Sequence, residues 1–141
     1  MSNHNTPRYY NEVSVGDSLE PAVFEVTQEK ARKYLEAVQD KTPFYLDAKR
    51  AREVSLEGMV APPTLAVLCC RLFPSPPGTV HVGQEFEFIK AMKVGDTIFA
   101  SGNITAKFEK KGKKFISYNI EGKNQSSEAV FKASATLILP A

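Results

Sequence analysis

The most apolar stretch of the chain lies in its middle, where nine of the ten residues from Leu65 to Pro74 are apolar and Arg71 is the exception. The stretch has no polar face at the helical period, and a helix that is apolar on all sides is normally buried. Pro63 suits the first turn of a helix, because the N–H that proline lacks has no helical partner there. The pattern therefore predicts a buried helix over residues 64–73. The stretch is too short for the ~20 residues of a membrane span.

Upstream of this stretch the periodicity changes along the chain. Residues 21–26 end in the apolar and polar alternation that is typical of a strand. Thr27 is a favoured N-cap residue, and residues 28–38 then place apolar side chains at helical spacing, which predicts an amphipathic helix. We expect this helix to end before Pro43, because the residue before a proline is disfavoured in helical conformation. A second short helix is expected over residues 48–54.

Downstream of the prolines that follow the apolar stretch, alternation with period two dominates. It predicts consecutive strands that pair antiparallel through hairpins, with residues 110–114 as one hairpin tip. One face of such a sheet must be covered, and the predicted buried helix is the only segment of suitable character. We therefore expect the α+β class and the hot-dog fold, a curved antiparallel sheet wrapped around one buried apolar helix. The strands are expected over residues 79–89, 97–109, 115–121 and 129–139.

The composition is that of an ordinary globular domain. The 141 residues are 43% hydrophobic and 24% charged, and the net charge of +2 indicates no strongly charged partner. We expect one domain over residues 1–141, with flexible residues 1–12. This first segment has no apolar core typical of a signal peptide, so the expected location is the cytoplasm. Cys69 and Cys70 are neighbours inside the apolar stretch, a spacing that suits neither a disulfide framework nor a zinc site. No metal and no cofactor is expected.

Several segments carry a resemblance to a known family. Residues 40–47 read Asp-Lys-Thr-Pro-Phe-Tyr-Leu-Asp, which is similar to a hydratase loop of the form Asp-x-Asn-Pro-Ile-His-x-Asp. Residues 60–64 read Val-Ala-Pro-Pro-Thr, and residues 9–17, 86–88 and 94–97 also fit. In this order the segments resemble the MaoC-like branch of the hot-dog superfamily, which includes R-specific enoyl-CoA hydratases and 3-hydroxyacyl-thioester dehydratases. The Ala-Pro-Pro-Thr sequence is similar to the N-terminal dehydratase type of that family.

The hydratase loop departs from the family pattern at its catalytic position. In active members an Asp and, five residues later, a His together activate a water and move a proton on the acyl chain. Asp40 matches the Asp, but Tyr45 stands at the His position and Thr42 stands where Asn is usual. A tyrosine with an ordinary pKa of about 10 is a poor general base at neutral pH. The histidines of the chain, His4 and His81, lie outside the motif.

The start of the predicted buried helix departs from the pattern as well. Active members usually have His-Gly there, and a backbone N–H near the Gly polarises the thioester carbonyl. Pro62 and Pro63 occupy the matching positions, and proline has no N–H to donate. The resemblance implies that these prolines and Thr64 lie at the substrate, with the Thr64 hydroxyl either at the mouth of the acyl tunnel or capping the helix.

The charged residues outside the motif allow weaker inferences. Arg71 must reach solvent or a partner, and a subunit interface is one hypothesis for it. The lysines of the predicted hairpin tip lack interleaved aromatic residues, so we expect them to be solvated rather than bound to nucleic acid. A phosphate of coenzyme A is a second candidate partner for them. These lysines are Lys110, Lys111, Lys113 and Lys114.

The sequence leaves more than one function open. The first hypothesis is a subunit of an enoyl-CoA hydratase or 3-hydroxyacyl-thioester dehydratase of fatty acid metabolism that has lost its own catalytic residues. Such a subunit would hold the acyl chain of an acyl-CoA or acyl-carrier thioester and pair with a catalytic MaoC-like subunit. The alternatives are a homodimeric hydratase that works through Asp40, with or without Tyr45, and an acyl-thioester-binding module without turnover. A thioesterase is disfavoured, because the apolar stretch carries no carboxylate and Glu57 precedes it. No nucleic acid and no membrane partner is expected.

Overall fold

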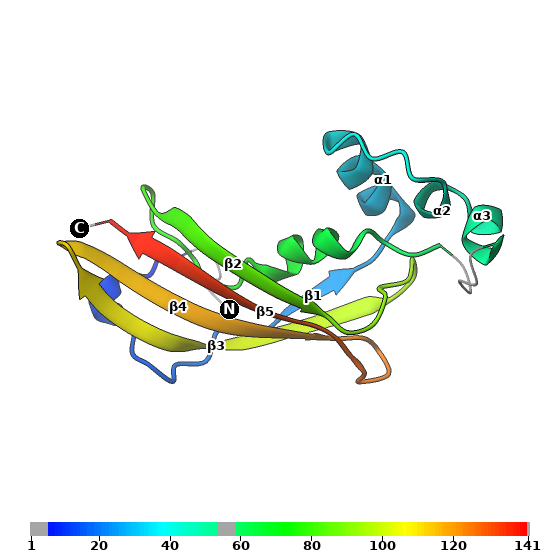
Figure 1. Cartoon of the computed structure of the whole chain (residues 1–141). Helices are drawn as coiled ribbons and strands as arrows, with labels where there is room; N and C mark the ends of the chain where they lie inside the picture. The colour runs from blue at the N-terminus through cyan, green and yellow to red at the C-terminus, as the bar shows by residue number, and fades with distance from the viewer. Residues whose placement is uncertain (1–5, 54–58, 141) are drawn as a thin grey trace.

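The structure is built on one antiparallel sheet, with its strands in the spatial order β1-β3-β4-β5-β2 (Figure 1). The computed structural model describes residues 6–53 and 59–140. The strands predicted from alternation are all confirmed, and so is the hot-dog fold. The elements in chain order are η1 (Tyr10–Glu12), β1 (Ala22–Glu25), α1 (Gln28–Ala37), α2 (Pro43–Leu46), α3 (Ala48–Glu53), η2 (Pro63–Cys70), β2 (Val80–Phe88), β3 (Thr97–Lys110), β4 (Lys113–Lys123) and β5 (Ala129–Leu139).

The place of β2 in the sheet differs from the prediction. We expected β2 and β3 to pair as a hairpin, but β2 lies at one edge of the sheet and pairs antiparallel with β5. The connection between β2 and β3, residues 89–96, explains the difference. Its backbone pairs with the segment before η2: the Ala61 N–H donates to the Met92 carbonyl at 2.7 Å, and Val60 forms a β-bridge with Lys93. Because this connection pairs with the segment before η2, it does not form the tight turn that a β2–β3 hairpin requires.

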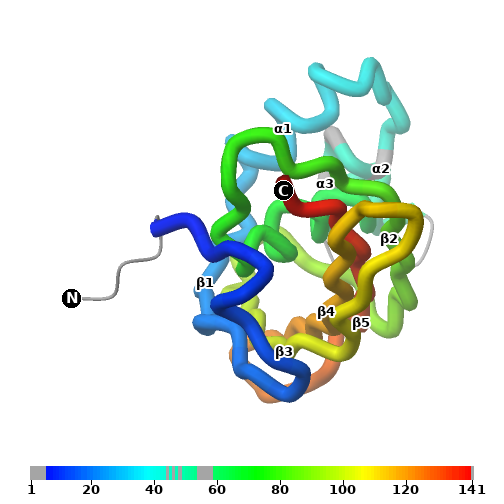
Figure 2. The backbone as a smooth tube through the Cα atoms, turned by 90° about the vertical axis from the view of Figure 1, so that its left-hand side faces the viewer, coloured from blue at the N-terminus to red at the C-terminus, as the bar shows by residue number. Residues whose placement is uncertain are grey.

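The core lies between the concave face of the sheet and η2, around which the sheet curves (Figure 2). Ile104, Ile116 and Phe131 face inward from three strands and are almost completely buried together with Leu65 of η2. Gly122 on β4 makes room for one of these rings, because a Cβ at this position would lie 2.2 Å from Cε1 of Phe131. The absence of a side chain at Gly122 thus allows an aromatic ring to lie directly against the strand.

The central helix is shorter and tighter than predicted. η2 has 3₁₀ geometry and ends at Cys70. Val67 is 37% exposed, so the expectation that this helix is buried on all sides was wrong. Among the described residues, the sheet buries one side of η2, while Val67 on the other side stays partly exposed. Arg71 follows the helix at the surface and reaches solvent. The buried residues of η2 are Leu65, Ala66, Cys69 and Cys70.

In the described part of the chain, the α-helices α1, α2 and α3 precede η2. α1 is capped as predicted, because Oγ1 of Thr27 accepts a hydrogen bond from the Lys30 N–H at 3.1 Å. Its apolar face buries Ala31 and Leu35, whereas Val38, expected on that face, is the C-cap residue and is 51% exposed. The short helix α2 was not predicted. α3 confirms the helix expected over residues 48–54, of which the last residue lies outside the described part of the chain.

The start of the chain, where we expected flexibility, makes defined contacts from residue 8 onward. The Arg8 N–H donates to the Pro74 carbonyl at 2.9 Å, and the Arg8 guanidinium pairs with Asp17 at 3.3 Å. Nζ of Lys107 lies 4.3 Å from the centre of the Tyr10 ring. These contacts join η1 to the end of the sheet that carries the β3–β4 hairpin.

Candidate functional site

An apolar cavity of about 400 Å³ lies between α2, the start of η2, the end of β2 and the start of β5. We call it the Tyr45 cavity. Of the predicted site residues, Tyr45 and Pro63 line it, whereas Asp40, Pro62 and Thr64 are not part of its wall. No histidine and no carboxylate is among the lining residues that the structure describes. The wall consists of Tyr45, Val60, Ala61, Pro63, Phe88, Ile89, Lys90, Ala91, Met92, Val130 and Phe131.

The loop that carries Asp40 begins with the end of α1. Gln39 adopts a left-handed conformation with a φ of 56°, and the Asp40 N–H donates to the Leu35 carbonyl at 2.9 Å. This is the pattern of a Schellman C-cap, so α1 ends well before Pro43 and the proline is not the cause. The tight cap fixes where the Asp40 side chain leaves the helix.

The carboxylate of Asp40 is occupied by its own loop. Oδ1 of Asp40 accepts hydrogen bonds from Oγ1 of Thr42 at 2.5 Å and from the Thr42 N–H at 2.9 Å. The hydroxyl and the amide of Thr42 stabilise the charged form and so lower the pKa of Asp40 below its ordinary value. A carboxylate with a lowered pKa is a weaker base at neutral pH.

Tyr45 lies half-buried in α2, with Pro43 at the first turn of that helix. Burial raises the pKa of the Tyr45 hydroxyl, and the negative charge of Asp40 raises it further. The electrostatic coupling places these two residues of the loop near one another. At neutral pH the pair is therefore a phenol that keeps its proton and a carboxylate that has lost its own. Tyr45 can donate a hydrogen bond at the cavity but cannot accept a proton there.

The start of η2 offers few backbone donors to the cavity. Pro62 and Pro63 have no N–H, and the Leu65 N–H already donates to the Pro62 carbonyl at 2.9 Å. Pro62 is the N-cap residue, and no side chain caps this helix, so the capping role considered for Thr64 was wrong. Oγ1 of Thr64 instead accepts a hydrogen bond from the Tyr34 hydroxyl at 2.5 Å. This bond joins α1 to η2.

The edge of the Tyr45 cavity carries a charged pair that the sequence motifs did not indicate. Nζ of Lys90, a lining residue, forms an ion pair with Glu128. Hydrogen bonds from Lys90 and from Asn124 lower the pKa of Glu128. The two charged residues are far apart in the sequence, on the connections that follow β2 and β4. Only the sheet order brings them together.

A second cavity, of about 460 Å³, lies at the other end of η2 and contains His81 in its wall. It also includes Arg71 and Tyr118, and burial raises the pKa of Tyr118 to about 12. His81 and Phe88 are seven residues apart on β2, which corresponds to ~23 Å. This imidazole is therefore too far from Tyr45 to replace the missing histidine. The thiols of Cys69 and Cys70 are buried, which raises the pKa of each to about 12, so they behave as small apolar groups.

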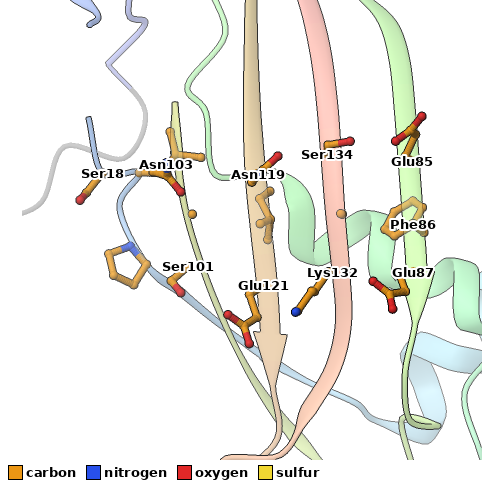
Figure 3. Close-up of a pocket in the computed structure, with 15 residues that line it drawn as sticks. Ser18, Glu85, Phe86, Glu87, Ser101, Asn103, Asn119, Glu121, Lys132 and Ser134 are labelled. Atoms are coloured by element: carbon orange, nitrogen blue, oxygen red, sulfur yellow. The ribbon is translucent and has the colours of Figure 1, made fainter. Parts of the chain in front are cut away.

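The outer face of the sheet forms a further hollow, of about 860 Å³. Figure 3 shows its side chains in rows across the strands, with Ser101, Glu121, Lys132 and Glu87 in one row. The next row consists of Asn103, Asn119, Ser134 and Glu85. This wall mixes charged and polar side chains with apolar ones, whereas the wall of the Tyr45 cavity is mostly apolar and so suits an acyl chain better. The Tyr45 cavity therefore remains the candidate for an acyl group.

Two further properties concern the part of the chain that the structure describes. In residues 6–53 and 59–140 no three His, Cys, Asp or Glu side chains are grouped so that they could hold a metal ion. Over the same residues, no helix combines the length and the apolar character that crossing a membrane requires.

Comparisons with known proteins agree with the fold and the motifs. The UPF0336 protein of Streptomyces coelicolor is 28% identical over 136 residues, which cover 88% of this chain and 91% of that protein. R-hydratase PhaJ1 of Pseudomonas aeruginosa superposes with a TM-score of 0.81 at 21% identity, covering 94% of this chain and 85% of that chain. The HadBC (3R-hydroxyacyl-ACP dehydratase) complex of Mycobacterium tuberculosis matches with a TM-score of 0.79 at 25% identity, over 88% of this chain and 96% of that chain.

The family described as FAS1-like, dehydratase domain region, matches residues 13–133. This span includes β1 and α1, the 40–47 loop, η2 and the sheet as far as the first half of β5. The resemblance seen in the short motifs thus extends over the chain. The chain belongs to the family described as FAS1-like, dehydratase domain region, and it shares its fold with R-hydratase and MaoC-like dehydratase structures.

Proposed function

We propose that the chain is the acyl-chain-binding subunit of an enoyl-thioester hydratase or 3-hydroxyacyl-thioester dehydratase. It lacks catalytic activity by itself and pairs with a catalytic hot-dog subunit. The observation that carries this proposal is the Tyr45 cavity, which is apolar and closed by Tyr45 and Pro63 where an active member has an imidazole and backbone amides. The acyl chain lies in the cavity, and the reaction takes place at the partner's catalytic groups.

The acid–base chemistry of the 40–47 loop supports a silent site, that is, a site without catalytic activity of its own. Hydration needs a base that takes a proton from water beside the double bond. The Tyr45 hydroxyl keeps its proton, because burial and Asp40 raise its pKa. The Asp40 carboxylate is charged, but Oδ1 is engaged by Thr42 and its pKa is lowered. Neither group is tuned toward neutral pH as a catalytic base requires.

The start of η2 supports the same conclusion independently. Negative charge develops on the thioester oxygen in the transition state and must be met by hydrogen-bond donors. Pro62 and Pro63 remove two amides from this end of the helix, and the Leu65 amide is engaged with Pro62. The Thr64 N–H is the first amide left in this segment. A site with so few donors can hold a thioester but stabilises its oxyanion poorly.

Binding of an acyl chain suits the walls of the cavity. Val60, Met92, Val130 and Phe131 are buried and apolar, while Phe88 and Ile89 are 45% and 47% exposed at the edge strand. Exposed apolar side chains on a sheet edge are typical of a surface that a second subunit covers. The matched HadBC protein is described as a complex, which agrees with a partner for this chain.

The proposal is tested by measuring hydration of crotonyl-CoA, followed by the loss of enoyl-thioester absorbance. We expect no enzymatic turnover from the purified chain, and turnover after addition of a hot-dog partner that has the complete Asp-x-Asn-Pro-x-His loop. The partner carrying His→Ala in that loop is the matched control and should abolish the activity of the pair. A normal enzymatic rate from the chain alone would refute the proposal in favour of a homodimeric hydratase using Asp40.

Binding separates the proposal from the remaining alternative. Titration with acyl-CoA of increasing chain length should show affinity that rises with length, because each buried methylene contributes about 0.8 kcal/mol. If the chain bound acyl-CoA tightly but no catalytic partner gave hydration in its presence, the chain would be a thioester-binding module instead. Absence of acyl-CoA binding, with or without a partner, would exclude both.

A further inference from the structure

The β3–β4 hairpin ends in two residue pairs that share one face of the sheet. Phe108 lies opposite Phe115, and Lys110 lies opposite Lys113. Side chains two residues apart on a strand point to the same face, so the lysine pair follows the aromatic pair directly. The two rings are stacked, with centroids 4.9 Å apart and planes 4° from parallel. We call these four residues the hairpin platform.

The platform is open to a ligand. Phe108 is 41% exposed, so the stacked pair lies partly open to solvent. Lys107 and Lys114, which belong to the same hairpin, are engaged by the Tyr10 ring, and Lys107 also donates to the Val13 carbonyl at 2.9 Å. By contrast, the side chains of Lys110 and Lys113 form no hydrogen bond or ion pair with any residue that the structure describes. The hairpin thus presents two free positive charges beside an exposed ring.

From this arrangement we infer that the hairpin platform binds the adenosine 3′,5′-bisphosphate end of coenzyme A. A flat aromatic surface stacks with a purine, and such stacking needs no particular hydrogen-bond pattern. Lysine side chains suit phosphates, since an ammonium is a compact charge that can follow a flexible anion. The nucleotide end of coenzyme A combines one purine with several phosphate charges. The inference deepens the proposed function, on which it rests, by assigning coenzyme A as the thioester carrier.

The location of the platform requires a second subunit. β3 runs from Thr97, five residues after Met92 in the cavity wall, to Lys110 at the tip, a length of ~45 Å. The platform therefore cannot bind the nucleotide of a substrate held in the cavity of its own chain. Coenzyme A carries its adenine at the end of a long pantetheine arm, so the nucleotide must bind well away from the thioester in any case.

If two subunits pair through their edge strands, the platform of one subunit lies near the substrate site of the other. β2 is an edge strand with exposed Val80 and Val82. A two-fold axis that joins two such edges makes the strands antiparallel. The hairpin end of one subunit then lies beside the Phe88 end of the other subunit's β2, with the platform two to three strand spacings, ~10–14 Å, from the edge strand of its own subunit. In the proposed pair this chain thus supplies the nucleotide contact for the partner's thioester.

The test is calorimetric titration of the full-length chain with adenosine 3′,5′-bisphosphate. We expect binding that weakens as salt is raised, because exposed charge pairs are screened. Lys110→Gln with Lys113→Gln, and separately Phe108→Ser, should each weaken it about tenfold. Lys123→Gln, at the exposed far end of β4, is the matched control and should leave the affinity unchanged. No binding, or equal affinity in all variants, would overturn the inference.

Steady-state kinetics separate this inference from the proposed function. In a reconstituted active pair, the double lysine variant should raise KM for crotonyl-CoA about tenfold and leave kcat unchanged. It should have no effect on crotonyl-pantetheine, which lacks the nucleotide. An equal loss on both substrates would overturn the platform but not the acyl-binding role. If the double lysine variant lost binding of acyl carrier protein but still bound the nucleotide, the inference would also be overturned, because the platform would then recognise a protein carrier. If no pair shows turnover, the proposed function fails while the titration still decides nucleotide binding.

Discussion

The hydroxyl of Tyr34 donates a hydrogen bond to Oγ1 of Thr64 at 2.5 Å, and this bond joins α1 to the start of η2. α1 leads through its C-cap into the loop that holds Asp40 and Tyr45, while Thr64 follows Pro63 in the wall of the Tyr45 cavity. One hydrogen bond between side chains therefore sets the two motif segments against each other. It is the direct link between the parts of the site that the sequence presents separately.

Tyr34→Phe removes this bond and keeps the ring. We expect the free energy of unfolding to fall by about 0.5–1 kcal/mol, at the lower end for a side-chain hydrogen bond because the pair is exposed. Urea unfolding followed by circular dichroism measures the change. Thr64→Val should cost a similar amount, and the double variant should cost little more than either single one. Additive losses would show that the two hydroxyls do not interact.

Gly122→Ala tests the contact between β4 and the core. The new Cβ would lie 2.2 Å from the Phe131 ring, and the ring cannot move away without disturbing the buried core. We expect a loss of about 1–3 kcal/mol in unfolding free energy, as for other overpacked cores. Gly83→Ala is the control, since a Cβ there would meet Thr136 at an ordinary 3.6 Å. Equal stabilities of the two variants would contradict the close approach of Phe131.

The strands could be predicted because alternation is a local property. Ile116, Tyr118 and Ile120 face inward at every second position of β4, as their spacing in the sequence indicates. The position of β2 could not be predicted, because it depends on the pairing of Ala61 with Met92, which belong to separate segments. The exposure of Val67 was missed because an apolar sequence gives no sign of which side the sheet covers.

The site could be predicted only where one segment contains it. Tyr45 and Pro63 were recognised from short motifs, and both line the cavity. Lys90 and Glu128 form their pair across two connections, so no spacing in the sequence indicates it. We noted that no aromatic residue is interleaved with the hairpin lysines, and this is correct within residues 110–114. Phe108 and Phe115 flank that run and stack only because the hairpin register places them opposite each other.

Thr42→Val tests the ionisation of Asp40. The hydroxyl and amide of Thr42 lower the pKa of Asp40 in the folded state. The stability this provides is present above the ordinary Asp pKa and is lost as the pH falls through the folded value. Without the hydroxyl, the pKa of Asp40 should rise toward its ordinary value, although the amide still donates. Carboxyl-carbon NMR titration measures it. Thr42→Ser keeps the hydroxyl and should leave the pKa unchanged, and an unchanged pKa in the valine variant would contradict the assignment.

Tyr45→His supplies the missing base, yet we expect it to leave the isolated chain inactive, because Pro63 still lacks an amide at the thioester. A positioned acid–base group contributes about 10²–10⁴ in rate, and one oxyanion donor about 10²–10³. Tyr45→His with Pro63→Gly should therefore hydrate crotonyl-CoA at least ~10²-fold faster than Tyr45→His. Pro63→Gly with Tyr45→Phe is the control that has the amide without the base. If Tyr45→His alone reached the rate of the double variant, the proline would not be a second defect, and the silent site would depend on the imidazole only.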